Sequence, residues 1–134
     1  MALVTPDAEA SIDASTAMFA PQITGLIAGE NLLALAPCYV KAADGKVYQS
    51  NGTAVNEAAK FDGITPRAAL LGQPVTLYAT GCRGRYATGL TPGQNLYVAA
   101  TAGRFDTVAT VGGTVPVARA IDTTDIRVII ASTG

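Results

Sequence analysis

Short apolar and alternating runs, separated by turn residues, dominate the chain from Gly25 onward. Residues 75–79 alternate with period two, which predicts a strand with one buried face. Residues 126–130 form an apolar run that is typical of a core strand. Turn signals recur about every 8–12 residues, the spacing of a β-sandwich or β-barrel. The pattern therefore predicts an all-β fold, a small β-barrel or β-sandwich, over residues 25–134.

Several local signals refine this prediction. Asp44 and Gly45 separate two β-forming runs, and Asp-Gly in that position is a strong hairpin signal. Residues 90–107 are organised as turn, strand, turn and strand. Pro116 lies early in the β-forming run 115–121, and it predicts an edge strand because proline cannot donate a hydrogen bond to a sheet.

The pattern of residues 1–24 is different, with apolar positions scattered among Ala, Ser and Thr. A Thr-Pro-Asp sequence at residues 5–7 could begin a helix, but the apolar positions form only a thin stripe. We expect an N-terminal arm that is extended or partly helical and is ordered by contact with a neighbour. A disordered leader is the alternative. The chain is thus divided into an arm, residues 1–24, and a β domain, residues 25–134.

The low charge of the chain narrows the choice of partners. Charged residues make up 14% of the chain and the net charge is −1, so neither nucleic acid nor an anionic membrane is an expected partner. No apolar run reaches membrane-spanning length. The first residues lack the basic and apolar regions of a secretory signal, so we expect a soluble protein made in the cytoplasm.

Candidate catalytic and metal-binding residues are few. The chain has no histidine, which removes the commonest general base and metal ligand. Asp122 and Asp125 flank two threonines, a pattern that fits a turn better than an acid/base pair. Cys38 and Cys82 lack metal-ligand spacing, and we interpret them as two separately buried thiols, with one disulfide as the alternative. We expect no enzymatic activity, no metal and no cofactor.

Arg83, Arg85 and Tyr86 form the only cluster of cationic and aromatic residues in the sequence. One interpretation is an exposed interface patch, because Arg and Tyr are enriched at the centres of protein interfaces. The other is a solvated hairpin in which the Arg side chains cover apolar surface. The sequence leaves both interpretations open.

Several short segments follow one another along the chain as a spaced pattern of turns and strands. They are GLIAGENL at 25–32, Val40, DGKVY at 44–48, FDGI at 61–64, GQPVTL at 72–77, GLTPGQNLYV at 89–98, TAG at 101–103 and VARAI at 117–121. This succession, over residues 25–131, resembles that of phage head decoration proteins, also called capsid cement proteins. The resemblance lies in a spaced pattern and not in a single diagnostic motif.

The resemblance implies a non-enzymatic structural protein on the outside of an expanded phage capsid. The implied partner is the major capsid protein, and the implied assembly is a homotrimer in the virion that staples neighbouring capsomers. Residues 1–24 match no part of the family pattern, so their contacts are inferred from their apolar side chains. We expect the shell or a subunit to be contacted by Leu3, Val4, Phe19, Ile23, Arg83, Arg85 and Tyr86.

Two other functions are consistent with the sequence. A phage fibre or baseplate module has a similar pattern of turns and strands. A carbohydrate-binding β-sandwich is more remote, because glycan sites usually present an exposed aromatic platform. This chain has no Trp and only five Tyr.

Overall fold

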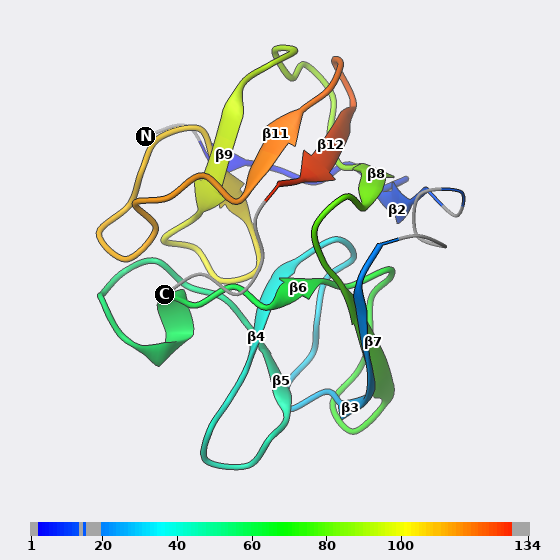
Figure 1. Cartoon of the computed structure of the whole chain (residues 1–134), viewed down its shortest axis with the longest axis vertical. Helices are drawn as coiled ribbons and strands as arrows, with labels where there is room; N and C mark the ends of the chain where they lie inside the picture. Colours follow the sequence, from blue (N-terminus) through cyan, green and yellow to red (C-terminus); the bar gives the residue numbers. More distant parts are fainter. Residues whose placement is uncertain (1–2, 14, 16–19, 130–134) are drawn as a thin grey trace.

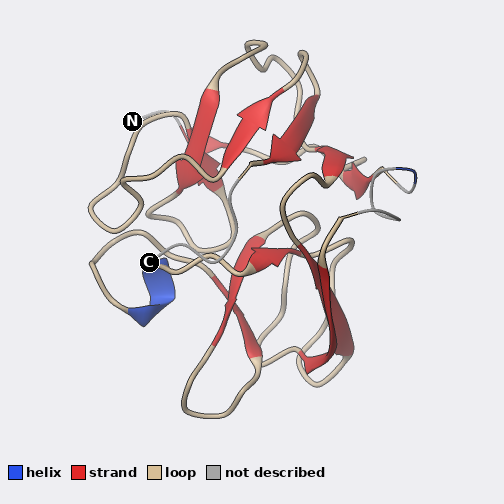
Figure 2. Ribbon diagram, viewed as in Figure 1, coloured by secondary structure: helices blue, strands red, loops and turns tan. Residues whose placement is uncertain are grey.

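The structure of the protein, a computed structural model, describes residues 3–13, 15 and 20–129. Figures 1 and 2 show two β-sheets, one in the upper half of the view and one in the lower half, connected by loops. Every pairing between named strands is antiparallel. The prediction of an all-β fold is therefore confirmed.

One sheet has seven strands and the other has five. In spatial order, the first consists of β1 (Leu3–Val4), β10 (Phe105–Asp106), β9 (Asn95–Val98), β11 (Ala118–Ala120), β12 (Asp125–Val128), β8 (Arg83–Arg85) and β2 (Ser11–Ile12). The second consists of β3 (Gln22–Ile27), β7 (Pro74–Tyr78), β6 (Gly63–Ile64), β4 (Pro37–Val40) and β5 (Val47–Gln49). A short 3₁₀ turn, η1 (Glu57–Ala59), lies between β5 and β6.

The seven-stranded sheet must bend, because β1 and β2 occupy its opposite edges and are joined only by residues 5–10. A flat sheet of this size would be about 29 Å wide at the usual strand spacing. The connecting chain reaches only about 24 Å when fully extended. The sheet therefore curves until its edges approach each other, and the interior that it encloses must be filled by side chains.

The five-stranded sheet curls as well. Its edge strands are tied together by a parallel bridge between Ala28 and Val47, and the amide of Gly29 donates a hydrogen bond of 2.8 Å to the carbonyl of Val47. The side chains of Leu32, Cys38 and Leu77 are buried among those that fill its interior. The result is a half-barrel with a small core of its own.

The larger core fills the space enclosed by the curved seven-stranded sheet and extends to the second sheet. Its centre is aromatic: the ring of Phe105 lies 5.1 Å from the ring of Tyr86 and 6.5 Å from the ring of Phe61, in edge-to-face geometry. Phe61 and Ile64 belong to the segment that contributes β6, so this core joins the two sheets.

Several local predictions are confirmed. β4 and β5 form the hairpin predicted at Asp44 and Gly45, where Gly45 adopts a φ of +69° that glycine tolerates without strain. β7 alternates as predicted, with Val75 and Leu77 buried. Asp122 is a turn residue as predicted, since its carboxylate accepts hydrogen bonds from the amides two and three residues later.

The prediction of an edge strand at residues 115–121 is wrong. β11 lies inside the sheet, between β9 and β12. The strand begins only at Ala118, so Pro116 precedes it and removes no donor from the hydrogen-bonded ladder. The proline therefore marks the approach to the strand and not an exposed edge.

The structure does not confirm a separate N-terminal arm. Residues 3–13 contribute a strand to each edge of the seven-stranded sheet, β1 beside β10 and β2 beside β8. The segment is extended, which is one of the two conformations predicted. It is ordered by pairing with strands of the same chain and not by contact with a neighbouring protein. Residue 14 and residues 16–19, which include Phe19, lie outside the described residues.

Candidate functional site

Arg83 is paired within the chain. Its Nε donates a hydrogen bond of 2.8 Å to Asp125, and its terminal nitrogen lies 3.3 Å from a carboxylate oxygen of Asp122. Arg83 lies on β8, and the two acids lie at the start of β12 and in the turn before it. The side chain of Arg83 is partly exposed, but the ion pairs fix it along its own sheet.

Asp122 should make stability depend on pH below about pH 4. Hydrogen bonds from the amide of Thr124, and then from that of Asp125, hold the pKa of its carboxyl below the usual value. A lowered folded-state pKa adds stability that is complete above the unfolded-state pKa, about 3.9, and is lost as the pH falls through the folded-state pKa. We expect Asp122→Ala to lower the melting temperature at pH 7, and the difference from the wild type to shrink toward pH 2.

Thermal unfolding followed by circular dichroism at both pH values checks this prediction. Thr123→Ala is the matched control, because Thr123 is exposed in the same turn, and it should have little effect at either pH. An equal loss for Asp122→Ala at both pH values would contradict the role given to the ionised carboxylate.

Arg85 forms ion pairs that connect the N-terminal segment to the seven-stranded sheet. Its guanidinium lies 3.0 Å from Asp7 and 3.5 Å from Glu9, and the amide of Asp7 donates a hydrogen bond of 2.9 Å to the carbonyl of Tyr86. A Cβ atom at Gly84 would lie 2.7 Å from the carbonyl oxygen of Ser11. Glycine is therefore needed at this position for β2 to approach β8.

Tyr86 is buried, which corrects the prediction that it lies in an exposed patch. Side chains alternate along a strand, so Gly84 and Tyr86 face the core while Arg83 and Arg85 face outward. The hydroxyl of Tyr86 accepts a hydrogen bond of 3.3 Å from the amide of Phe105. Burial raises the pKa of this hydroxyl. Tyr86 therefore belongs to the core and is not available to a partner.

Among the described residues, the predicted contact residues of the N-terminal segment also divide into one that is buried and two that are exposed. Val4 pairs with Phe105 and is only 8% exposed, so it packs into the core and cannot reach a shell. Leu3, on β1, and Ile23, on the edge strand β3, are both 38% exposed. The structure places Val4 and Tyr86 in the larger core and leaves Ile23 on the other sheet.

Four exposed valines, including the two most exposed apolar side chains of the described residues, lie on two loops that the sequence analysis did not single out. Residues 51–56 and 107–117 lie side by side (Figure 1), and the amide of Gly112 donates a hydrogen bond of 3.0 Å to the carbonyl of Gly52. Neither segment contains a charged residue. We call these segments the valine loops after their exposed side chains, which are Val55 (83%), Val108 (49%), Val111 (67%) and Val115 (45%).

A second exposed apolar surface lies at one end of the five-stranded sheet. Leu70 and Leu71 begin a tight turn closed by a hydrogen bond of 3.0 Å from the amide of Gln73 to the carbonyl of Leu70. The amide of Leu71 donates a hydrogen bond to the side chain of Asn31, which places the turn beside the segment that contains Leu33. Leu33, Leu70 and Leu71 are 41%, 61% and 65% exposed, and we call them the leucine patch.

Sequence reasoning missed both surfaces, although one signal was available for each. Leu70 and Leu71 come directly before a Gly-Gln-Pro turn, and turns lie at the surface. The valine loop 107–117 contains paired glycines and a proline, which interrupt any strand that could bury its valines. Apolar residues inside turn sequences thus indicated exposed apolar surface.

The two cysteines are free and buried, as predicted. Burial is the main cause that raises the pKa of each thiol, so both are held protonated and are poor nucleophiles. Within the described part of the chain, no cluster of Cys, Asp or Glu has the arrangement of a metal site. In the same residues, no helix is long and apolar enough to cross a bilayer.

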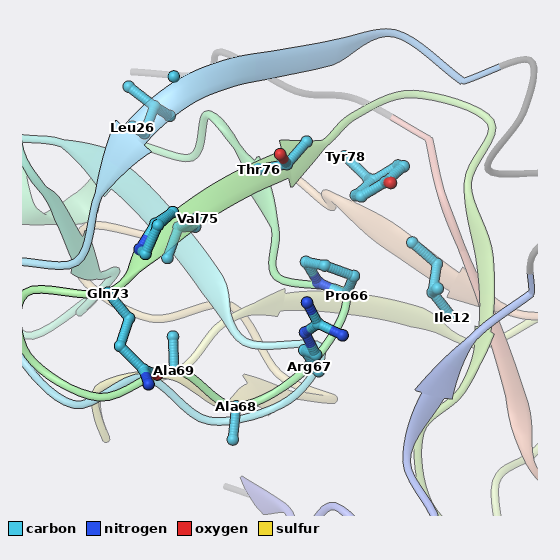
Figure 3. Close-up of a pocket in the computed structure, with 12 residues that line it drawn as sticks. Ile12, Leu26, Pro66, Arg67, Ala68, Ala69, Gln73, Val75, Thr76 and Tyr78 are labelled. Atoms are coloured by element: carbon cyan, nitrogen blue, oxygen red, sulfur yellow. The ribbon is translucent and has the colours of Figure 1, made fainter.

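An open groove of about 730 Å³ lies beside β7. Figure 3 shows its walls: Val75 and Tyr78 on β7, the loop that carries Pro66 and Arg67, and Ile12 from the other sheet. Among the described residues of the lining, Arg67 is the only charged one.

The described residues therefore offer apolar loop surfaces and one groove as candidate binding features. Arg83 and Arg85, which the sequence analysis singled out, form ion pairs within the chain, and Tyr86 is buried in its core. No model of a known protein family matches the chain, and a search of curated proteins likewise gives no match.

Proposed function

We propose that this chain is a structural protein of a phage virion that binds the outside of the capsid and stabilises the shell. The observation that carries the proposal is the uncharged surface of the valine loops, with Val111 67% and Val55 83% exposed. Exposed apolar side chains gathered on neighbouring loops mark protein-binding surfaces. The resemblance to capsid decoration proteins supports a shell, and its major capsid protein, as the partner.

The physical basis of the proposed binding is burial of apolar surface repeated at many symmetric sites. Covering one exposed valine contributes about 1.5–3 kcal/mol before the costs of association are subtracted. A modest affinity at each site suffices when copies staple many neighbouring capsomers. The leucine patch gives the chain a second apolar surface, and in the proposed homotrimer one surface serves the shell and the other serves a neighbouring subunit.

Sedimentation of the purified protein with expanded, undecorated shells of its phage tests the proposal. We expect the wild type to saturate at a number of copies allowed by icosahedral symmetry. Val111→Asp should weaken binding at least about tenfold, because a charge replaces a side chain that becomes buried at the contact. Thr123→Asp, which adds the same charge on an exposed turn outside the valine loops, should bind like the wild type.

The other outcomes are informative. If Val111→Asp and Val55→Asp both bind like the wild type, the valine loops are not the contact surface. If the wild type does not bind the shells at any concentration tested, the decoration function is overturned. A fibre or baseplate module would then be the next function to test.

A further inference from the structure

The groove beside β7 presents hydrogen-bond donors whose partners are not supplied by the protein. No described residue forms a hydrogen bond or an ion pair with the guanidinium of Arg67, or with the hydroxyls of Tyr78 and Thr76. The side-chain oxygen of Gln73 accepts a hydrogen bond of 2.8 Å from the amide of Leu70, which leaves the NH₂ group of Gln73 as a further donor. Unlike Arg83 and Arg85, the exposed Arg67 therefore has no side-chain partner among the described residues.

The lining selects for an anion. Arg67 contributes a positive charge, and among the described residues no carboxylate lines the groove to neutralise it or to compete for it. An arginine side chain presents several N–H donors in a plane that matches a carboxylate. A carboxylate is therefore the group that best completes the polar part of the groove.

The remaining side chains of the lining are mostly aliphatic, which favours a peptide that carries apolar side chains. Ile12, Leu26 and Val75 contribute aliphatic surface, and prolines stand at positions 66 and 74. Sugar sites usually present an exposed aromatic platform, and the groove offers one aromatic ring, that of Tyr78.

We propose that this groove binds an acidic side chain of an extended peptide, with Arg67 holding the carboxylate and the aliphatic walls holding apolar neighbours in that peptide. Its volume, about 730 Å³, falls within the range of pockets that bind ligands in proteins. The inference goes beyond the proposed capsid function, because it concerns a different surface and is tested without shells.

A titration followed by ¹H–¹⁵N NMR of the full chain tests this proposal. The probe is the blocked pentapeptide acetyl-Thr-Val-Glu-Val-Thr-amide, and the matched probe carries Gln in place of Glu. We expect the Glu peptide to shift the side-chain signals of Arg67 and Gln73, with a dissociation constant of about 1 mM. Arg67→Gln should weaken this binding about tenfold.

Arg127→Gln is the control variant, because Arg127 is also an exposed arginine but lies on β12, outside the groove. It should bind the Glu peptide like the wild type. Equal binding of the Gln peptide would overturn the role of the carboxylate. Shifts at the groove with glucuronic acid but not with the Glu peptide would overturn the peptide and indicate an acidic sugar. Absence of shifts with every probe would overturn the site.

Discussion

Replacing Phe105 with alanine is expected to lower the free energy of unfolding by about 3–5 kcal/mol, the usual cost of truncating a buried aromatic ring. Phe105 is fully buried. Its ring contacts those of Tyr86 and Phe61, which come from different sheets. On β10 it pairs with Val4 on one side and Val98 on the other. The cavity would therefore open where both sheets and the N-terminal segment meet.

Urea denaturation followed by circular dichroism measures this effect. Val108→Ala is the matched control, because Val108 lies close by in the sequence but is 49% exposed, and such a change usually stays within about 0.5 kcal/mol. Tyr86→Phe should cost less than Phe105→Ala, about 1 kcal/mol, because it keeps the buried ring and removes only the hydroxyl that accepts a hydrogen bond from the amide of Phe105. A loss below about 1 kcal/mol for Phe105→Ala would show that the ring is not central to the core.

The elements predicted correctly from the sequence are those whose signal is local. The hairpin at Asp44 and Gly45 depends on two adjacent turn residues. The buried face of β7 depends on alternation over five residues. The alternation can be read within a short window, although β7 itself pairs with the distant strand β3, so the window predicts the buried face but not the partner strand.

The wrong prediction for β11 and the unconfirmed arm both concern pairings between distant parts of the chain. Asp7 and Arg85 are 78 positions apart, and nothing in residues 1–24 indicates that β2 fits against Gly84. The position of β11 inside the sheet is likewise set by β9 and β12, which local propensity cannot show. A segment with scattered apolar residues looked like an arm because its complementary surface lies elsewhere in the sequence.

The candidate surfaces were also hidden for a physical reason. Valines usually indicate buried strands, and the exposure of Val55 and Val111 follows from two loops packing through their backbones. Arg67 resembles any surface arginine in the sequence, and it differs only because the folded groove brings donors and no acid around it. Exposure and missing partners are properties of the assembled fold, so they become visible only in the structure.

Deleting residues 1–13 is expected to destabilise the whole domain, whereas deletion of a detachable arm would leave its stability unchanged. The deletion removes both edge strands of the seven-stranded sheet. It also removes two apolar side chains, Val4 and Ile12, that pack on the larger core. At about 1.5–3 kcal/mol for the buried Val4 and about half of that for the partly buried Ile12, the loss amounts to about 2–4 kcal/mol, a large part of the stability of a typical domain.

Two further variants separate the causes of this effect. Arg85→Gln removes only the partly exposed ion pairs to Asp7 and Glu9, and we expect it to cost about 1 kcal/mol or less. Gly84→Val keeps the whole chain but places a side chain against the carbonyl of Ser11, so it should displace β2 and lie between the other two variants. Urea denaturation ranks all three. A truncated chain that unfolds at the same urea concentration as the wild type would show instead that residues 1–13 are a removable arm, available to contact a neighbouring protein.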